Sequence, residues 1–295
     1  RTTLAMVKQL TGAGINIIMD PILIFGYFGF PRMEVAGAAA ATVLGQIVAA
    51  IMAVVMNLKC NPDVNIRLRE IRWNGHVAGE IYRVGFPSIV MQSIGSVMVF
   101  GMNKILFGFT KTATAVFGAY FKLQSFIFMP VFGLNNGMVP IVAYNFGAGR
   151  MDRVKKTVKL AVCTAVAIMA VGLAIFQLAP ELLLSFFDAS EEMLEIGSVA
   201  LRIISLSFLL AGFCIIAGSV CQAIGNPFYS LIVAVARQLV VLLPVAWLLS
   251  RSGRLELVWV AFPVAELMSL TLSAIFLRRT LRSAEARVAG TPRQT

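Results

Sequence analysis

The sequence predicts an all-helical membrane protein that crosses the lipid bilayer about eight times. Three observations support this fold class. The chain has 295 residues, of which 59% are hydrophobic and only 13% are charged, whereas soluble domains have about 45–50% apolar and about 25% charged residues. The apolar residues form runs of about 20 residues or more, the length of a membrane-crossing helix. Most Lys and Arg residues lie in the short polar segments between these runs, so the sequence does not describe a soluble globular domain.

Eight apolar runs follow one another along the chain, and each is predicted to be one span. They are Leu4–Phe28, Val35–Leu58, Ile81–Phe109, Thr112–Tyr144, Val158–Leu178, Ile196–Gln222, Phe228–Ser250 and Leu255–Leu277. The fourth run contains Pro130, Gly133, Gly137 and Pro140. These residues predict that the fourth helix is kinked or ends early, because proline removes a backbone hydrogen bond.

The segments that connect the spans form two alternating sets. The first set is 59–80, 147–160, 223–227 and 278–295. The second set is 29–34, 110–111, 179–195 and 251–256. The first set carries 14 Lys and Arg residues and the second only four. Because Lys and Arg are enriched in cytoplasmic loops, we expect the first set, and with it both ends of this chain, to be cytoplasmic.

A weak internal repeat predicts how the spans are grouped. When the chain is shifted by 223 positions, residues 5–58 lie over residues 228–281 without a gap, and Pro21 falls on Pro244. Parallel repeats of this kind occur in transporters built from two bundles. If the repeats are equal, four more helices precede Arg1 and the complete protein has twelve. The predicted parts are residues 1–58 (the last two helices of an amino-terminal lobe), 59–80 (a cytoplasmic linker), 81–280 (a six-helix carboxy-terminal lobe) and 281–295 (a cytoplasmic tail).

Several functional classes lack the residues that they need. The net charge of +11 is spread over short loops and forms no continuous basic face, so we expect no nucleic-acid partner. The chain has a single histidine, His76, and four cysteines without paired spacing, which disfavours a histidine-based metal site or a Ser-His-Asp triad. A membrane-embedded enzyme of the prenyl-transferase or phosphatase type needs clustered acids or histidines, and no Asp-x-x-Asp motif is present.

Ionisable residues inside spans are candidate functional residues, because placing charge in lipid is costly. Asp20 is the strongest candidate, since Asn16 lies four residues before it and therefore on the same helix face. A carboxylate and an amide at this spacing can offer oxygens to a cation, and the carboxylate can also carry a proton. Pro21 leaves a backbone carbonyl one turn earlier as a further ligand. The alternative is a carboxylate that faces water near the end of its helix.

Glu266 lies in the middle of the last span, and Arg237 of the preceding span is a candidate partner. A carboxylate at this depth favours a role in a substrate cavity, while a structural ion pair with Arg237 is the alternative. The other candidates for the cavity are polar residues of the fourth span. They are Lys122, Gln124, Asn135 and Asn136.

Several motifs together resemble the multidrug and toxic compound extrusion (MATE) family. The resemblance covers the whole chain, from the fifth helix of that family to the twelfth. The matching stretches are Gly14–Gly26, Val35–Thr42, Gly85–Pro87, Pro140 with Tyr144–Gly149, and Gln222–Pro227.

The resemblance implies twelve helices in two lobes and export of organic cations and drugs in exchange for Na⁺ or H⁺. It implies no enzymatic activity and no cofactor. In one branch of the family, the cation site contains an Asp on the first helix, an Asn–Asp pair on the fifth and a Thr on the sixth. The last three match Asn16, Asp20 and Thr42. Another branch uses acids on the seventh and tenth helices, but residues 81–109 and 196–222 contain no Asp or Glu, which favours the site in the amino-terminal lobe.

The expected partners are the lipid bilayer and a small organic cation or drug, and the expected state is a monomer in a bacterial inner membrane. Two other functions stay open at this point. A flippase for lipid-linked sugars would need a strongly cationic cavity, for which Lys104, Lys122 and Arg237 are available. A membrane-embedded enzyme is the alternative from a different class.

Overall fold

The computed structural model describes residues 2–60 and 74–290. Contacts divide the chain into two compact units, Arg1–Asn74 and Gly75–Thr295. The described residues form helices joined by turns and short connections, with no strand among them. The predicted all-helical fold class is therefore confirmed, and each unit is described by itself.

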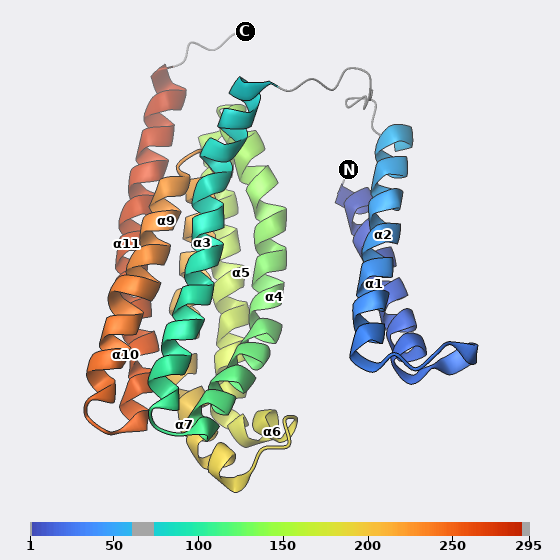
Figure 1. The fold of residues 1–295 in the computed structure, drawn as a ribbon. Helices are drawn as coiled ribbons and strands as arrows, with labels where there is room; N and C mark the ends of the chain where they lie inside the picture. The colour runs from blue at the N-terminus through green and yellow to red at the C-terminus, as the bar shows by residue number, and fades with distance from the viewer. Residues whose placement is uncertain (1, 61–73, 291–295) are drawn as a thin grey trace. The chain divides into compact units, whose positions relative to one another are not determined.

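The amino-terminal unit is a hairpin of two helices, α1 (Thr2–Phe25) and α2 (Glu34–Cys60), as Figure 1 shows. A short 3₁₀ turn, η1 (Tyr27–Gly29), lies between them. Gly26 leaves α1 with a φ angle of 77°, in the left-handed region that glycine adopts without strain. Pro21 lies inside α1, yet the helix continues to Phe25.

Glycines allow α1 and α2 to approach each other closely. A Cβ atom added at Gly37 would overlap the backbone carbonyl of Leu23, and one added at Gly45 would lie 2.9 Å from the carbonyl oxygen of Gly12. Small residues at such contacts let the backbones of membrane helices pack tightly. This packing brings the polar residues of α1 next to α2.

The carboxy-terminal unit is a bundle of long helices that lie side by side (Figure 1). Its elements are α3 (Gly75–Phe107), α4 (Lys111–Gly147), α5 (Met151–Leu178), α6 (Pro180–Ser185), α7 (Glu191–Ser205), α8 (Phe208–Ala223), α9 (Pro227–Val235), η3 (Ala236–Leu242), α10 (Leu243–Ser250) and α11 (Leu255–Gly290). The eight predicted spans all fall on helices of the two units.

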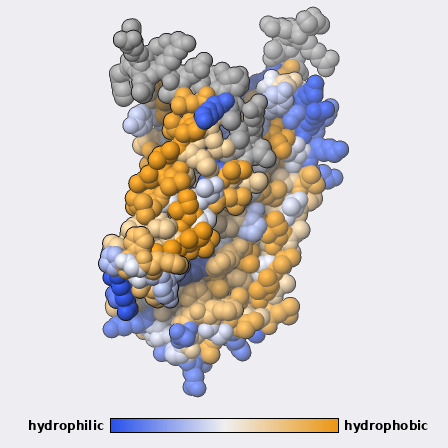
Figure 2. All heavy atoms as spheres, turned by 90° about the vertical axis from the view of Figure 1, so that its right-hand side faces the viewer, coloured by the Kyte–Doolittle hydropathy of each residue, from blue (hydrophilic) through white to orange (hydrophobic). Residues whose placement is uncertain are grey.

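In the described part of the chain, six helices are long and apolar enough to cross a membrane, or seven if the bent pair α7–α8 is one span. α1 has 24 residues but is not among them; Lys8, Asn16 and Asp20 interrupt its apolar run. Figure 2 shows apolar side chains covering most of the visible surface between the helix ends, while hydrophilic residues gather towards the ends. This distribution fits a lipid surrounding.

The predicted span Ile196–Gln222 is not one straight helix, because α7 and α8 meet at an angle of 49°. At the break, the Ser205 and Ser207 hydroxyls donate to carbonyls three residues back, at 3.0 and 2.6 Å. Gln177 of α5 donates to the Arg202 carbonyl at 2.7 Å. These side chains replace part of the helical hydrogen bonding, and bends arise at such sites.

Prolines affect two of the helices in different ways. α4 runs without interruption from Lys111 to Gly147 through Pro130 and Pro140, so the prediction that it ends early is wrong. Membrane helices tolerate proline because neighbouring helices, side chains and local adjustments of the helix can pair the backbone groups that proline leaves free. Before Pro244, the seventh span contains the π-helical turn η3, where the N–H of Leu243 donates to the Gln238 carbonyl five residues earlier.

The helix bounds overlap two of the predicted parts of the chain. The central residues of the predicted linker, 61–73, lie outside the described residues. α3 begins at Gly75, inside the predicted linker 59–80. α11 continues to Gly290, past the predicted start of the tail at residue 281.

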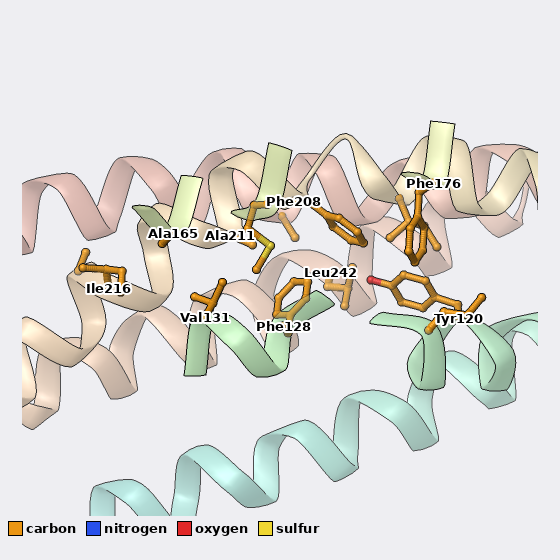
Figure 3. Packing of buried hydrophobic residues seen from close by; sticks show 14 of the residues in the cluster. Tyr120, Phe128, Val131, Ala165, Phe176, Phe208, Ala211, Ile216 and Leu242 are labelled. Carbon is orange, nitrogen blue, oxygen red and sulfur yellow. The ribbon is translucent and has the colours of Figure 1, made fainter. Parts of the chain in front are cut away.

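The core of the carboxy-terminal unit lies between α4, α5 and α8. Figure 3 shows Phe128 and Val131 of α4 facing Ala211 and Phe208 of α8. The Phe208 ring packs edge-on against Phe128, with 5.4 Å between ring centroids, and lies 5.0 Å from the ring of Phe176 in α5. Such aromatic contacts add to the packing that holds these helices together.

The contact between α1 and α2 can be tested with two matched substitutions. We expect Gly37→Ala to destabilise the protein by about 1–3 kcal/mol, because the added methyl group overlaps the Leu23 carbonyl. Gly14→Ala is the control, since nothing lies within 4 Å of the added Cβ. Thermal unfolding in detergent, followed by size-exclusion chromatography, measures both. Equal stability of the two variants would contradict the close packing described here.

Candidate functional site

Three of the predicted site residues meet in the amino-terminal unit. The Asn16 side chain on α1 lies between Asp20, one turn further along the same helix, and Thr42 on α2. Asn16 Nδ2 is 3.5 Å from Asp20 Oδ1 and 3.3 Å from Thr42 Oγ1. The structure therefore brings Asn16, Asp20 and Thr42 together, although 26 residues separate Asn16 from Thr42 in the sequence.

When the Asn16 amide group is flipped, so that its oxygen and nitrogen exchange places, both atoms have suitable hydrogen-bond partners. In that orientation Nδ2 donates to Asp20 Oδ2 at 3.3 Å, and Oδ1 lies 3.3 Å from both the backbone N and the Oγ1 of Thr42. The Thr42 hydroxyl also lies 2.9 Å from the Ala38 carbonyl of its own helix, to which it donates. Asn16 thus holds Asp20 beside α2, in a half-buried position that solvent can still reach.

The second pair of predicted residues forms an ion pair in the carboxy-terminal unit. Arg237 Nη1 donates to Glu266 Oε2 at 3.2 Å, and the two side chains are 34% and 7% exposed. Arg237 lies on the π-helical turn η3 and Glu266 lies on α11. The other carboxylate oxygen, Glu266 Oε1, has no hydrogen-bond partner among the described residues. The Cys214 thiol, a weak donor, lies beside this carboxylate.

A cavity of about 700 Å³ lies next to this ion pair. Residues from α3, α4, α8, η3 and α11 line it. Its polar side chains include Gln92, Ser96, Asn103, Gln124, Arg237, Gln238 and Glu266. Its aromatic side chains are Phe100, Tyr120, Phe121, Phe128 and Phe262. Protein cavities of about 300–1,000 Å³ with apolar walls and a few polar groups suit drug-sized molecules.

The predicted cavity residues divide into two groups. Gln124, Arg237 and Glu266 line the cavity. The others do not belong to its lining: Lys122 is exposed and places Nζ 5.8 Å from the centre of the Phe187 ring. Asn136 is exposed too, whereas Asn135 has a buried side-chain oxygen without a partner in the described part of the chain.

The cavity also contains features that the sequence interpretation missed. Gln238 is buried beside Arg237, and its side-chain oxygen has no partner among the described residues. Gln238 lies on the π-helical turn η3, and this position indicates a functional role because such turns are frequent at functional sites. Pro244 in the apolar run could have indicated an irregular helix at this point. The aromatic residues of the wall could not be chosen from the 21 Phe residues of the sequence.

Comparison with known proteins decides the family. The MatE family model matches residues 87–248, which is more than half of the chain. The chain belongs to the MatE family. The resemblance seen in the sequence motifs is thereby confirmed. The matched residues lie in the carboxy-terminal unit and include α8, η3 and most of α3 and α10.

Curated relatives of this MatE family chain include multidrug export proteins named MepA. The chain is 28% identical over 281 residues to MepA of Staphylococcus haemolyticus (strain JCSC1435), which covers 95% of this chain and 60% of that protein. It is 30% identical over 257 residues to MepA of Staphylococcus saprophyticus subsp. saprophyticus, which covers 87% of this chain and 56% of that protein. The chain thus spans less than two thirds of the length of these relatives.

Solved MATE structures share the fold. A crystal structure of MATE in the bent conformation superposes with a TM-score of 0.84 at 23% identity, over 97% of this chain and 63% of that one. An outward-facing multidrug resistance MATE transporter of the MOP superfamily superposes with a TM-score of 0.85 at 23% identity, over 96% and 63%. This chain is therefore a multi-pass helical membrane protein with the MATE transporter fold.

The ion pair at the cavity predicts strong energetic coupling between its partners. We expect the destabilising effects of Arg237→Gln and Glu266→Gln to add up to more than the effect of the double variant, with a coupling of about 0.5–3 kcal/mol. Each single change leaves a charge without its partner, which is costly for the buried carboxylate. Chemical unfolding in detergent micelles measures the three variants.

The ion pair between Lys155 of α5 and Glu285 of α11 provides the control, because both side chains are exposed. We expect much weaker coupling for Lys155→Gln with Glu285→Gln, since exposed pairs contribute little. Strictly additive effects at Arg237 and Glu266 would contradict the interaction.

Proposed function

We propose that the complete protein exports organic cations and drugs in exchange for Na⁺ or H⁺. The observation that carries this proposal is the cluster of Asn16, Asp20 and Thr42 on two neighbouring apolar helices. The MepA relatives, which are named multidrug export proteins, support the transported class. MATE structures with TM-scores of 0.84 and 0.85 support the fold on which such transport operates.

The cluster has the chemistry that a coupling ion needs. No basic residue of the described chain pairs with Asp20, so its charge is available to a cation or a proton. Asn16 and Thr42 add an amide and a hydroxyl at 3.3 Å from each other. Pro21 cannot donate to the Ile17 carbonyl, which becomes a further oxygen ligand. Ionisable groups inside membrane helices typically mark ion and proton pathways of this kind.

Coupling requires that the ion and the drug favour different conformations of the transporter. In the mechanism that we propose, two bundles rock about sites near the middle of the membrane and expose them alternately to each side. Binding of Na⁺ or H⁺ at Asp20 favours the conformation that releases the drug outside. The cavity beside Arg237 and Glu266 has a volume of about 700 Å³, which suits a drug.

The location and assembly belong to the same proposal. The distribution of basic residues between the two sets of loops supports an orientation with both ends of this chain in the cytoplasm. The MepA relatives from bacteria support a bacterial inner membrane. We propose that it works as a monomer. The flippase alternative needs a strongly cationic cavity, but the lining holds one Arg, and Glu266 neutralises it. Nothing in the described structure favours an enzyme over a transporter.

The coupling site predicts the effect of one substitution in cells. We expect Asp20→Asn to abolish active export of ethidium, because the variant can carry neither a cation nor a proton at this position. The complete gene is expressed in a drug-sensitive bacterium loaded with ethidium, and efflux is followed by fluorescence. Imposing a Na⁺ gradient at fixed pH, and then a pH gradient without Na⁺, identifies the coupling ion.

Asp188→Asn is the matched control, because it makes the same chemical change at an exposed residue outside the spans. Asn also tolerates the positive φ angle of 48° at that position. We expect this control to export ethidium like the wild type. Gradient-driven efflux that persists in Asp20→Asn would exclude Asp20 as the coupling residue and direct attention to Glu266.

A further inference from the structure

The start of α5 and the end of α11 meet at one end of the carboxy-terminal bundle. Glu285 of α11 forms an ion pair with Lys155 of α5. A Cβ atom added at Gly149, just before α5, would lie 3.5 Å from Cγ1 of Val288 on α11. Ala284 of the same segment of α11 is buried. The last turns of α11 are therefore held against the start of α5, and we call the line along which they meet the α5–α11 seam.

Both helices are longer than the hydrocarbon of a bilayer is thick. α5 has 28 residues and α11 has 36, which makes them about 42 and 54 Å long, whereas the hydrocarbon is about 30 Å thick and takes about 20 residues to cross. Figure 1 shows the last turns of α11 beyond the start of the neighbouring α9. About 20 residues counted from Leu255 along α11 end near Ile275, and about 20 counted back from Leu178 along α5 end near Lys159. Residues past these two points lie at the level of the lipid headgroups.

Three basic side chains border the seam at this level. Lys159 follows Lys155 by four residues, so the two share a face of α5. Arg282 and Arg278 precede Glu285 by three and seven residues, so all three share a face of α11. Lys159, Arg278 and Arg282 are exposed, and none of them forms an ion pair in the described part of the chain. Their positive charges therefore converge on the seam, one or two turns closer to the membrane than the ion pair.

Towards the middle of the membrane the same faces become apolar. Cys163 and Ala167 continue the face of Lys159 at steps of four residues, and both are exposed. Ile275 continues the face of Arg278 one turn deeper and is 42% exposed. A cationic section followed by an apolar section matches the order of a phosphate and its acyl chains in a phospholipid. A water-soluble anion would use the cationic section alone.

We propose that the α5–α11 seam binds an anionic phospholipid, with Lys159, Arg278 and Arg282 around its phosphate and the apolar faces along its acyl chains. Arginine forms paired hydrogen bonds with phosphate oxygens, and lysine adds a compact positive charge. Basic clusters at the membrane surface attract anionic headgroups. Glu285 limits the affinity, because it neutralises Lys155 at the same seam. This inference goes beyond the proposed function and needs neither its coupling ion nor its drug.

Native mass spectrometry of the complete protein in detergent tests the inference. The probes are dioleoyl phosphatidylglycerol and dioleoyl phosphatidylcholine, which have the same acyl chains and differ in net charge. For the wild type we expect the first phosphatidylglycerol to bind about tenfold more tightly than the first phosphatidylcholine. In Lys159→Gln/Arg278→Gln/Arg282→Gln this preference should disappear, because the charges around the phosphate are lost. Size-exclusion chromatography and the unfolding temperature without added lipid show that the variant is folded.

Arg150→Gln/Arg153→Gln/Arg279→Gln is the matched control. It removes the same number of charges from exposed residues at the same end of the bundle. Arg150 precedes α5, and the spacings of Arg153 from Lys155 and of Arg279 from Glu285 place them on other helix faces. The control should keep the tenfold preference of the wild type. An equal loss in both triple variants would mean a diffuse attraction to the whole basic surface and would overturn the seam as a site.

Two further measurements complete the test. Glu285→Gln releases Lys155 to the seam, so we expect its preference for phosphatidylglycerol to rise about threefold above that of the wild type. Glycerol 1-phosphate, the soluble headgroup analogue, should not displace bound phosphatidylglycerol even in large excess, because it has no acyl chains. Displacement by this analogue would assign the site to a soluble anion instead of a lipid. A wild type without preference for phosphatidylglycerol, or a Glu285→Gln variant with a weaker preference, would also overturn the inference.

Discussion

The lack of water in the middle of the bilayer is the constraint on which the rest of the structure depends. Without water, each backbone N–H and C=O must find its partner inside the chain, and helices achieve this for every span. The few irregular points are supported by side chains. Ser205, Ser207 and Gln177 satisfy carbonyls at the bend between α7 and α8. The π-helical turn η3 precedes Pro244 in the same way, as a local adjustment within a continuous span.

Because of the same constraint, much of the fold could be predicted from the sequence. Long apolar runs leave little choice of structure, so the predicted spans fell on helices, although α5 begins before its predicted span and α11 continues well past the predicted end. The contact between Asn16 and Asp20 follows from the helical period, and Thr42 followed from the family resemblance. The bend after Ser205 and the uninterrupted α4 were not predictable in this way. They depend on contacts between distant segments, such as Gln177 with Arg202, which no local pattern records.

The cavity illustrates the same difference between local and distant contacts. Its ion pair was predictable, because a carboxylate deep in a span needs a partner and Arg237 lies in the neighbouring span. Lys122 has an equally costly charge, but α4 turns it to the exposed side, near Phe187. Gln238 carries no charge and therefore gave no signal in the sequence. Only the packing of α3, α4 and α11 around η3 shows that it faces the cavity.

The predicted internal repeat allows the chemistry of the two units to be compared position by position. The shift of 223 positions places α1 and α2 over the segments α9–α10 and α11, and each pair of helices is joined by a polar contact. In the amino-terminal unit this contact joins Asn16 to Thr42 and leaves Asp20 without a basic partner among the described residues. In the carboxy-terminal unit, Leu243 stands at the position of Asp20, and Arg237 neutralises Glu266. The amino-terminal unit therefore retains a negative charge, whereas the cavity of the carboxy-terminal unit is lined by a neutralised ion pair. In the exchanger that we propose, the first helix pair would bind the coupling ion and the second would border the drug cavity, so that ion and drug can favour different conformations.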